Sequence, residues 1–272
     1  MELLRTGAVA VGLAVCFGAL PAAAQMRDNT EKQLTCDNNY NNDRPHHCEM
    51  REQTVPAVGS LKVDGGRNGG ATIKGWLRSE ILVRSRVEAS ADSEAAAASI
   101  ASTVMVDSSG GQVHATGPES RDHEGWSVSY EIFVPQSTDL TVQTYNGGLT
   151  ISDVRGQIRF TGHNGGVNLK RVGGDVSGDT VNGGVHEELA GTIWDGRQLD
   201  VSTRNGGVTL SMPSNYSAHV QAETTNGGLS SDFPMTLRGD IRLRNLDFNV
   251  GAGGPLIHVS TENGGVKLQK TE

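Results

Sequence analysis

Several features that mark common protein classes are missing from this chain of 272 residues. Basic residues number 23 against 31 acidic ones, and the net charge of −8 argues against nucleic acid or an anionic membrane as a partner. The 36 glycines do not recur at every third position, which excludes a collagen-like chain. Charged residues make up 20% of the chain and hydrophobic residues 36%, which is too apolar for a disordered protein. A folded chain with about twice the usual share of glycine remains.

Long apolar stretches are also missing beyond the first 24 residues. Residues 1–24 are typical of a secretory signal peptide, with Arg5, an apolar stretch over 7–20 and a small-residue cleavage site at 22–24. The apolar run continues past Cys16, which disfavours lipid attachment at that cysteine. We therefore expect an exported protein that is periplasmic, surface-located or secreted, with no membrane span after cleavage.

Cysteine is scarce, and only Cys36 and Cys48 follow the predicted signal peptide. In an oxidising compartment this pair predicts a disulfide that would staple the polar residues between the two cysteines. Their neighbours His46 and His47 leave a metal site as the alternative, but the cysteine spacing is wide for zinc and a second ligand pair is missing. We expect a disulfide-stapled segment over residues 25–56 and no bound metal.

One tripeptide, Asn-Gly-Gly, recurs seven times with similar flanking residues. Its asparagines are Asn68, Asn146, Asn164, Asn182, Asn205, Asn226 and Asn263. Apolar or small residues stand six, four and two places before the asparagine and three and five places after it. This period of two predicts two short β-strands per repeat, each with one buried face. We expect Asn-Gly to supply the left-handed backbone of a tight turn between them.

Two all-β architectures can be built from this unit. In an antiparallel meander or sandwich, each Asn-Gly would form a hairpin turn. In a β-solenoid, each unit would be one coil, and equivalent strands of successive coils would pair in parallel. The 18-residue spacing from Asn146 to Asn164 and from Asn164 to Asn182 favours the solenoid, because it keeps the asparagines in phase. Their side chains would then stack into a hydrogen-bonded ladder.

Residues 76–135 interrupt the repeat but keep β-type alternation over much of their length. The alanine-rich stretch 92–104 predicts a short helix with Ser90 or Asp92 as a capping candidate. Such a helix would cover one open end of the stack, which would otherwise be an aggregating edge.

Residues suited to catalysis do not form a recognisable motif. Asp153, Asp175, Asp179, His163 and His186 occupy different phases of the repeat, so no carboxylate pair recurs at a spacing suited to glycoside hydrolysis. The threonines two places before most of the asparagines are expected to be buried or at an edge, in preference to an ice-binding array. The three tryptophans are expected to pack in the core. We predict a protein that is not an enzyme and binds no cofactor.

Four stretches carry a resemblance to a known family. They are Cys36 with His46-His47-Cys48-Glu49, the stretch Leu61-Lys-Val-Asp-Gly-Gly-Arg-Asn-Gly-Gly, Trp126-Ser-Val-Ser-Tyr, and the Asn-Gly-Gly-Val series. With these, residues 57–272 resemble the bacterial putative adhesin family (domain of unknown function 4097). The resemblance implies a solenoid-like β fold and a location in the cell envelope, with no assigned reaction.

The sequence therefore predicts a signal peptide at 1–24, a polar cysteine-containing segment at 25–56 and an adhesin-like repeat domain at 57–272. The expected function is non-catalytic: a binding or structural module that presents a stacked β face to an unidentified envelope polymer, surface or protein. An envelope-stress sensor, a role discussed for some members of the resembled family, is the first alternative. A polysaccharide-degrading β-helix enzyme is the second, and it would need a cleft with two facing carboxylates.

Overall fold

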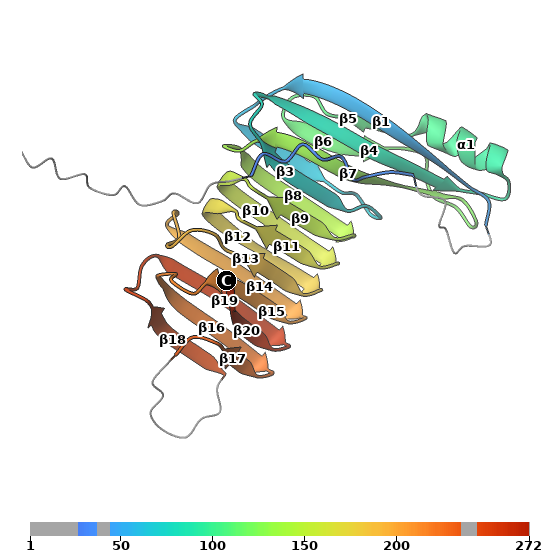
Figure 1. Cartoon of the computed structure of the whole chain (residues 1–272). Helices are drawn as coiled ribbons and strands as arrows, with labels where there is room; N and C mark the ends of the chain where they lie inside the picture. The colour runs from blue at the N-terminus through green and yellow to red at the C-terminus, as the bar shows by residue number, and fades with distance from the viewer. Residues whose placement is uncertain (1–26, 37–43, 235–243, 272) are drawn as a thin grey trace, which may run out of the picture.

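The computed structural model describes residues 27–36, 44–234 and 244–271, so the predicted signal peptide and Cys16 lie outside it. Within these ranges the chain is all-β apart from one helix, α1 (Glu94–Thr103). The strands form two ten-stranded sheets of mixed direction that enclose one main hydrophobic core (Figure 1). No helix in the described ranges is long and apolar enough to span a membrane.

The two sheets are called sheet A and sheet B here. Sheet A has the order β1 (His46–Pro56), β4 (Glu80–Ser90), β7 (Gly125–Pro135), β3 (Ala71–Trp76), β9 (Leu149–Ser152), β11 (Val167–Lys170), β13 (Val185–Glu188), β15 (Val208–Pro213), β20 (Val266–Thr271) and β17 (Leu229–Ser231). Sheet B has the order β18 (Asn245–Val250), β16 (Ala218–Asn226), β19 (Leu256–Asn263), β14 (Gln198–Asn205), β12 (Gly173–Asn182), β10 (Arg155–Asn164), β8 (Asp139–Asn146), β2 (Ser60–Asp64), β6 (Gln112–Thr116) and β5 (Met105–Asp107).

Each Asn-Gly-Gly forms a corner between the two sheets. The strand before it belongs to sheet B and the strand after it to sheet A, as for β8 and β9 on either side of Gly147. Equivalent strands of neighbouring units pair in parallel and in register, so Asn164 lies opposite both Asn146 and Asn182. The hairpin interpretation of Asn-Gly is therefore wrong at these corners. The two sheets do face each other in two layers, as the sheets of a β-sandwich do.

The first corner glycine is required by close stacking of the units. A Cβ atom on Gly183 would lie 2.1 Å from the carbonyl oxygen of Gly165, and one on Gly206 would lie 2.2 Å from that of Gly183. Among the corner residues only Gly165 has a positive φ, at 156°, so the prediction of a left-handed Asn-Gly turn is wrong. In the regular units, left-handed residues occur instead at the opposite corner, where Asp153 has φ 57° and Arg171 has φ 50°.

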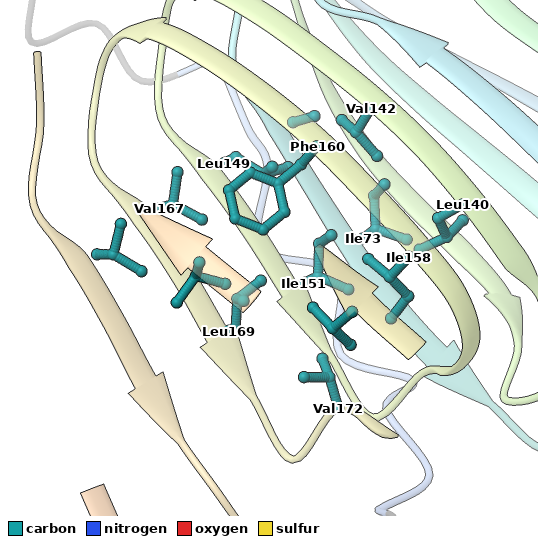
Figure 2. Packing of buried hydrophobic residues seen from close by; sticks show 14 of the residues in the cluster. Ile73, Leu140, Val142, Leu149, Ile151, Ile158, Phe160, Val167, Leu169 and Val172 are labelled. Atoms are coloured by element: carbon teal, nitrogen blue, oxygen red, sulfur yellow. The ribbon is translucent and has the colours of Figure 1, made fainter. Parts of the chain in front are cut away.

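The core follows the same repeat. Leu140 of β8 and Ile158 of β10 lie on one side of the interior, and Ile151 of β9 and Leu169 of β11 lie on the other (Figure 2). All four side chains are at most 1% exposed. Full burial of a side chain of this size stabilises the fold by about 1.5–3 kcal/mol, so the alternating columns supply the main driving force for stacking.

The last repeat does not occupy the last place in the stack. Strands β19 and β20 lie between β14–β15 and β16–β17 (Figure 1), and Asn263 is in register with both Asn205 and Asn226. The expectation that successive units are neighbours therefore fails at this end. The 37 residues from Asn226 to Asn263 give the chain room to form β17 and β18 before it returns. Strand β18 pairs antiparallel with β16 and forms the edge of sheet B.

The helix α1 packs against the long strands β1 and β4 near the other end of the stack (Figure 1). Its N-cap is Ser93, whose hydroxyl accepts a hydrogen bond from the backbone N–H of Ala96 at 3.2 Å. The capping candidates Ser90 and Asp92 are therefore wrong, since Ser90 is the last residue of β4. The inner face of the helix buries Ala97, which joins the main core.

An extended segment, residues 27–36, crosses the outside of sheet A and is called the strap here. The disulfide between Cys36 and Cys48 joins it to β1, with 5.9 Å between the Cα atoms, and confirms the predicted pairing. The strap makes one backbone hydrogen bond to sheet A, from the N–H of Asn29 to the carbonyl oxygen of Gly75 at 3.3 Å. Most of its other contacts are with side chains of that sheet.

One strap contact is a buried carboxylate, Glu131 of β7, which is 1% exposed. Glu131 accepts hydrogen bonds from Lys74 Nζ at 2.8 Å and from the backbone N–H groups of Gln33 (2.9 Å) and Leu34 (3.1 Å), and it pairs with Arg84. Burial alone would raise the pKa of Glu131, but these hydrogen bonds outweigh it and lower the pKa below its usual value.

A second buried carboxylate, Asp153, holds the start of the strap. Its side chain accepts two hydrogen bonds from the Arg171 guanidinium (2.7 and 2.8 Å), one from the Asn29 amide (2.6 Å) and one from the backbone N–H of Arg27 (3.0 Å). Burial alone would raise the pKa of Asp153, but the hydrogen bonds from these donors outweigh burial and lower the pKa below its usual value. The strap is thus fixed at both ends by charged groups that water does not reach.

Candidate functional site

The outer face of sheet B carries a groove of about 420 Å³ across β12, β14, β19 and β16. Two columns of side chains line it, one place and three places before the corner asparagines. The first column is Val181, Arg204, Glu262 and Thr225, and the second is Asp179, Ser202, Ser260 and Glu223. Arg244 also lines the groove. The short side chains of Ser202 and Ser260, between longer acids at either end of their column, account for the hollow.

The floor of the groove is a row of buried threonines. Thr203 donates its hydroxyl hydrogen bond to the carbonyl oxygen of Gly183 (2.7 Å), and Thr261 does the same to Gly206 (2.8 Å). Each of these glycines is the first of a neighbouring corner. The buried threonines that line the groove are Thr180, Thr203, Thr224 and Thr261. They are at most 6% exposed, as is Thr144 at the equivalent position of β8 outside the groove. The expectation of buried threonines is confirmed, and a solvent-facing ice-binding array is excluded at these positions.

The asparagines border the groove as a continuous ladder. In the order Asn68, Asn146, Asn164, Asn182, Asn205, Asn263 and Asn226, each side-chain amide donates to the Oδ1 of the asparagine before it at 2.7–2.9 Å. All six bonds run in the same direction. The ladder keeps neighbouring units in register and so holds the two columns of the groove in line.

The lining of the groove is polar and of mixed charge. Arg204 lies 3.5 Å from Glu262, and the Asn245 amide donates to Glu223 at 3.2 Å. With Asp179 and Arg244, the groove holds three acids and two arginines. Such a surface offers hydrogen-bond donors and acceptors side by side and has only a small excess of negative charge.

A histidine–carboxylate pair lies on the same strands. His258 Nδ1 of β19 is 2.7 Å from Asp200 Oδ1 of β14. The two residues are 58 positions apart and meet because β19 pairs with β14. The sequence shows no sign of this pair, since neighbouring units were expected to follow chain order. The described residues hold no group of three His, Cys, Asp or Glu side chains suited to a metal ion.

The acids and histidines singled out from the sequence lie in different places. Asp153 is buried under the strap, Asp175 is near the start of β12, and Asp179 lines the groove. His163 is on β10 of sheet B, whereas His186 is exposed on β13 of sheet A. The structure does not bring these five residues together into one site.

The histidines beside Cys48 belong to strand β1. His47 Nε2 is 3.8 Å from a carboxylate oxygen of Glu49, whose other oxygen is bound by Arg51. These pairs join alternate residues of one strand, and Arg51 also donates to the carbonyl oxygen of Ala101 in α1 at 2.8 Å.

Two of the three tryptophans are core residues, as predicted. Trp76 and Trp194 are each 3% exposed, and Trp76 packs against Phe133 with ring centroids 5.3 Å apart. Trp126 is half-buried and donates its indole N–H to the carbonyl oxygen of Pro118 at 2.8 Å. None of the three lies in the groove.

Comparison with known proteins leaves the family undecided. No protein-family model matches the chain, and no curated protein matches its sequence, so the resemblance to the putative adhesin family stays a prediction. A putative cell adhesion protein from Clostridium sporogenes is similar in structure, with a TM-score of 0.44 and 11% identity over 83% of this chain and 100% of the other.

Two further solved structures are more distant. A putative lipid binding protein from Parabacteroides distasonis has a TM-score of 0.34 and 8% identity over 82% of this chain and 97% of the other. A putative adhesin from Bacteroides fragilis has a TM-score of 0.31 and 11% identity over the same shares of the two chains. Likeness at this level does not decide a fold or a function.

Proposed function

We propose that the chain is an exported, non-catalytic binding module of the bacterial cell envelope, built as a β-solenoid whose units present sheet B to a polymer, a surface or another protein. The division into a signal peptide at 1–24, a stapled segment at 25–56 and a repeat domain at 57–272 is part of this proposal. The adhesin-like role follows the sequence resemblance, and the geometry described here supports binding in its own right.

The groove on sheet B is the observation that carries the proposal. It combines Arg204, Arg244, Glu223 and Glu262 with serine hydroxyls on a face whose columns are held in line by the asparagine ladder. Polar side chains that converge on a preformed hollow are typical of a binding site. The face repeats from unit to unit, which suits an extended ligand.

A turnover function has less support. The Asp200–His258 pair has no nucleophile bonded to it among the contacts of the described residues. In the groove, Glu262 faces Arg204 and Glu223 accepts from Asn245, so both carboxylates are already engaged by donors. A hydrolase that uses two carboxylates needs one of them as an acid and the other free to act on water or sugar.

Sedimentation with insoluble envelope material tests the function. The chain without residues 1–24 would be mixed with peptidoglycan, chitin or isolated envelope fragments, and the protein left in solution would be measured alongside new reducing ends. Binding without new reducing ends is the expected result. Release of reducing ends would favour the hydrolase, and no depletion from solution by any of these materials would contradict a binding module.

A further inference from the structure

The column of residues one place before the asparagines continues beyond the groove. It runs from Tyr145 on β8 and His163 on β10 through Val181 to Arg204 and Glu262. These residues share a column because the asparagines that follow them pair in register along the sheet. The groove is therefore one part of a longer line of outward side chains.

An exposed aromatic platform stands at the far end of this line. The rings of Tyr145 and His163 stack with centroids 4.3 Å apart and an angle of 32° between their planes. Tyr145 remains 49% exposed, in a chain with 12 aromatic residues of which most are buried or half-buried. A tyrosine held by a stacked neighbour presents a ring face to solvent at little entropic cost.

The platform and the groove together form one track along neighbouring strands. Neighbouring strands lie about 4.8 Å apart, and the track crosses six of them from β8 to β16. It is therefore about 24 Å long, and it runs across the strands beside the asparagine ladder. A ligand that contacts both ends of the track must be an extended polymer of several monomers.

The side chains of the track indicate the chemical class of the ligand. Guanidinium groups, carboxylates and hydroxyls side by side suit a ligand that donates and accepts hydrogen bonds at close intervals. The ring face of Tyr145 suits flat apolar patches on the same ligand. Three acids against two arginines repel a polyanion, and a purely apolar ligand would take these charges out of water without offering them a hydrogen bond.

We infer that this track, from Tyr145 on β8 past Arg204 and Glu262 to β16, binds a neutral polysaccharide chain laid across the strands. Sugar rings stack on Tyr145 and His163, and hydroxyl groups further along the chain pair with the arginines and carboxylates of the groove. The inference rests on the proposed binding function and adds to it a place and a ligand class.

Affinity electrophoresis tests the inference. The chain without residues 1–24 is run through native gels that contain hydroxyethyl cellulose, mixed-linkage β-glucan or galactomannan, with polygalacturonate as the anionic comparison. Retardation in at least one neutral gel and none in the anionic gel is expected. Tyr145→Ala and Arg204→Ala should each weaken retardation about fivefold or more, as is typical when an aromatic or arginine anchor is removed.

Matched variants separate a lost site from a lost fold. Lys267→Ala removes an exposed charge from β20 on the opposite sheet and should bind as the wild type does. Ser260→Tyr fills the groove and should abolish binding, while urea denaturation shows that the variant is folded.

Two results overturn the inference. If the wild type is retarded but Tyr145→Ala and Arg204→Ala match it, the track is wrong while the proposed binding function stands. If no neutral polysaccharide retards the wild type, the ligand class is wrong, and sedimentation with envelope material then decides the proposed function separately.

Discussion

Asn263 donates its side-chain amide to Asn205 across 58 residues of sequence, at 2.9 Å, and accepts a hydrogen bond from Asn226 at the same distance. The last repeat in the sequence thus has an internal position in the ladder, between Asn205 and Asn226. The unit that ends in Asn226 makes its parallel pairing with this last repeat, through β16 with β19 and β17 with β20. The groove spans this junction, so the order of the units is what creates it.

The ladder predicts a graded effect of asparagine substitutions. Asn182→Ala removes two side-chain hydrogen bonds, to Asn164 and from Asn205, whereas Asn226→Ala removes one. Because both side chains are exposed, each bond contributes about 0.5–1 kcal/mol to stability. We expect Asn182→Ala to lower the free energy of unfolding by about 1–2 kcal/mol and Asn226→Ala by about half of that. Urea denaturation measures both, and equal or negligible losses would contradict a contributing ladder.

The two glycines of the corner after Asn146 should differ in how well they tolerate an added methyl group. A Cβ on Gly147 would lie 2.3 Å from the carbonyl oxygen of Gly69, whereas one on Gly148 would lie 3.5 Å from that of Gly166. Gly147→Ala should therefore force the units apart and lower stability by about 3 kcal/mol or more. Gly148→Ala should change stability by less than about 1 kcal/mol. Thermal unfolding of the two variants compares them directly, and similar melting temperatures would disprove the stacking explanation.

The features that could be predicted from the sequence are those encoded within one repeat. Alternation around Asn146 or Asn164 is enough to predict two short strands and a corner, and the constant phase of the asparagines is enough to predict that they stack. The disulfide between Cys36 and Cys48 follows from an even pair of cysteines after a predicted signal peptide. None of these predictions needs knowledge of which units are neighbours.

The features that could not be predicted depend on contacts between units. All repeats have similar flanks, so nothing in the sequence shows that β19 lies beside β14 or that Ser202 and Ser260 form one hollow. The strap has no apolar period because it is held by charges from distant strands, such as Glu131. The need for glycine at position 183 is likewise visible only as a short distance to the next corner.

The buried carboxylate of Glu131 predicts that acid weakens the strap. The folded pKa of Glu131 is lowered, so its contribution to stability is present above the unfolded pKa of 4.5 and is lost as pH falls through the folded value. The backbone amides of Gln33 and Leu34, which donate to Glu131, should then exchange faster with solvent. Hydrogen exchange between pH 6 and pH 3, corrected for intrinsic rates, tests this.

A variant comparison isolates the role of Glu131. Glu131→Gln leaves Lys74 and Arg84 without their buried counter-charge and should cost about 3–5 kcal/mol at neutral pH. Glu119→Gln changes an exposed acid and should have no measurable effect on the strap. If both variants keep the amides of Gln33 and Leu34 equally protected, the carboxylate does not hold the strap.

The core contains one acid whose effect on stability should grow with pH. Glu187 of β13 occupies an inward position between Leu169 of β11 and Leu210 of β15, and it is 2% exposed. Neither carboxylate oxygen has a hydrogen-bond partner among the described residues. Burial raises the pKa of Glu187 to about 8 from the usual value of 4.5.

Because the folded pKa is raised, the destabilising effect of Glu187 is absent below about pH 4.5, increases between the two pKa values, and is complete above about pH 8. Replacement by leucine continues the apolar column and removes the titration. The gain in unfolding free energy of Glu187→Leu over the wild type should therefore be larger at pH 9 than at pH 4 by about 4–5 kcal/mol. Urea denaturation at pH 4, 6.5 and 9 measures it, with Glu187→Gln as a second variant that also lacks the charge. Parallel stability curves for the wild type and both variants would show that Glu187 does not titrate within the core.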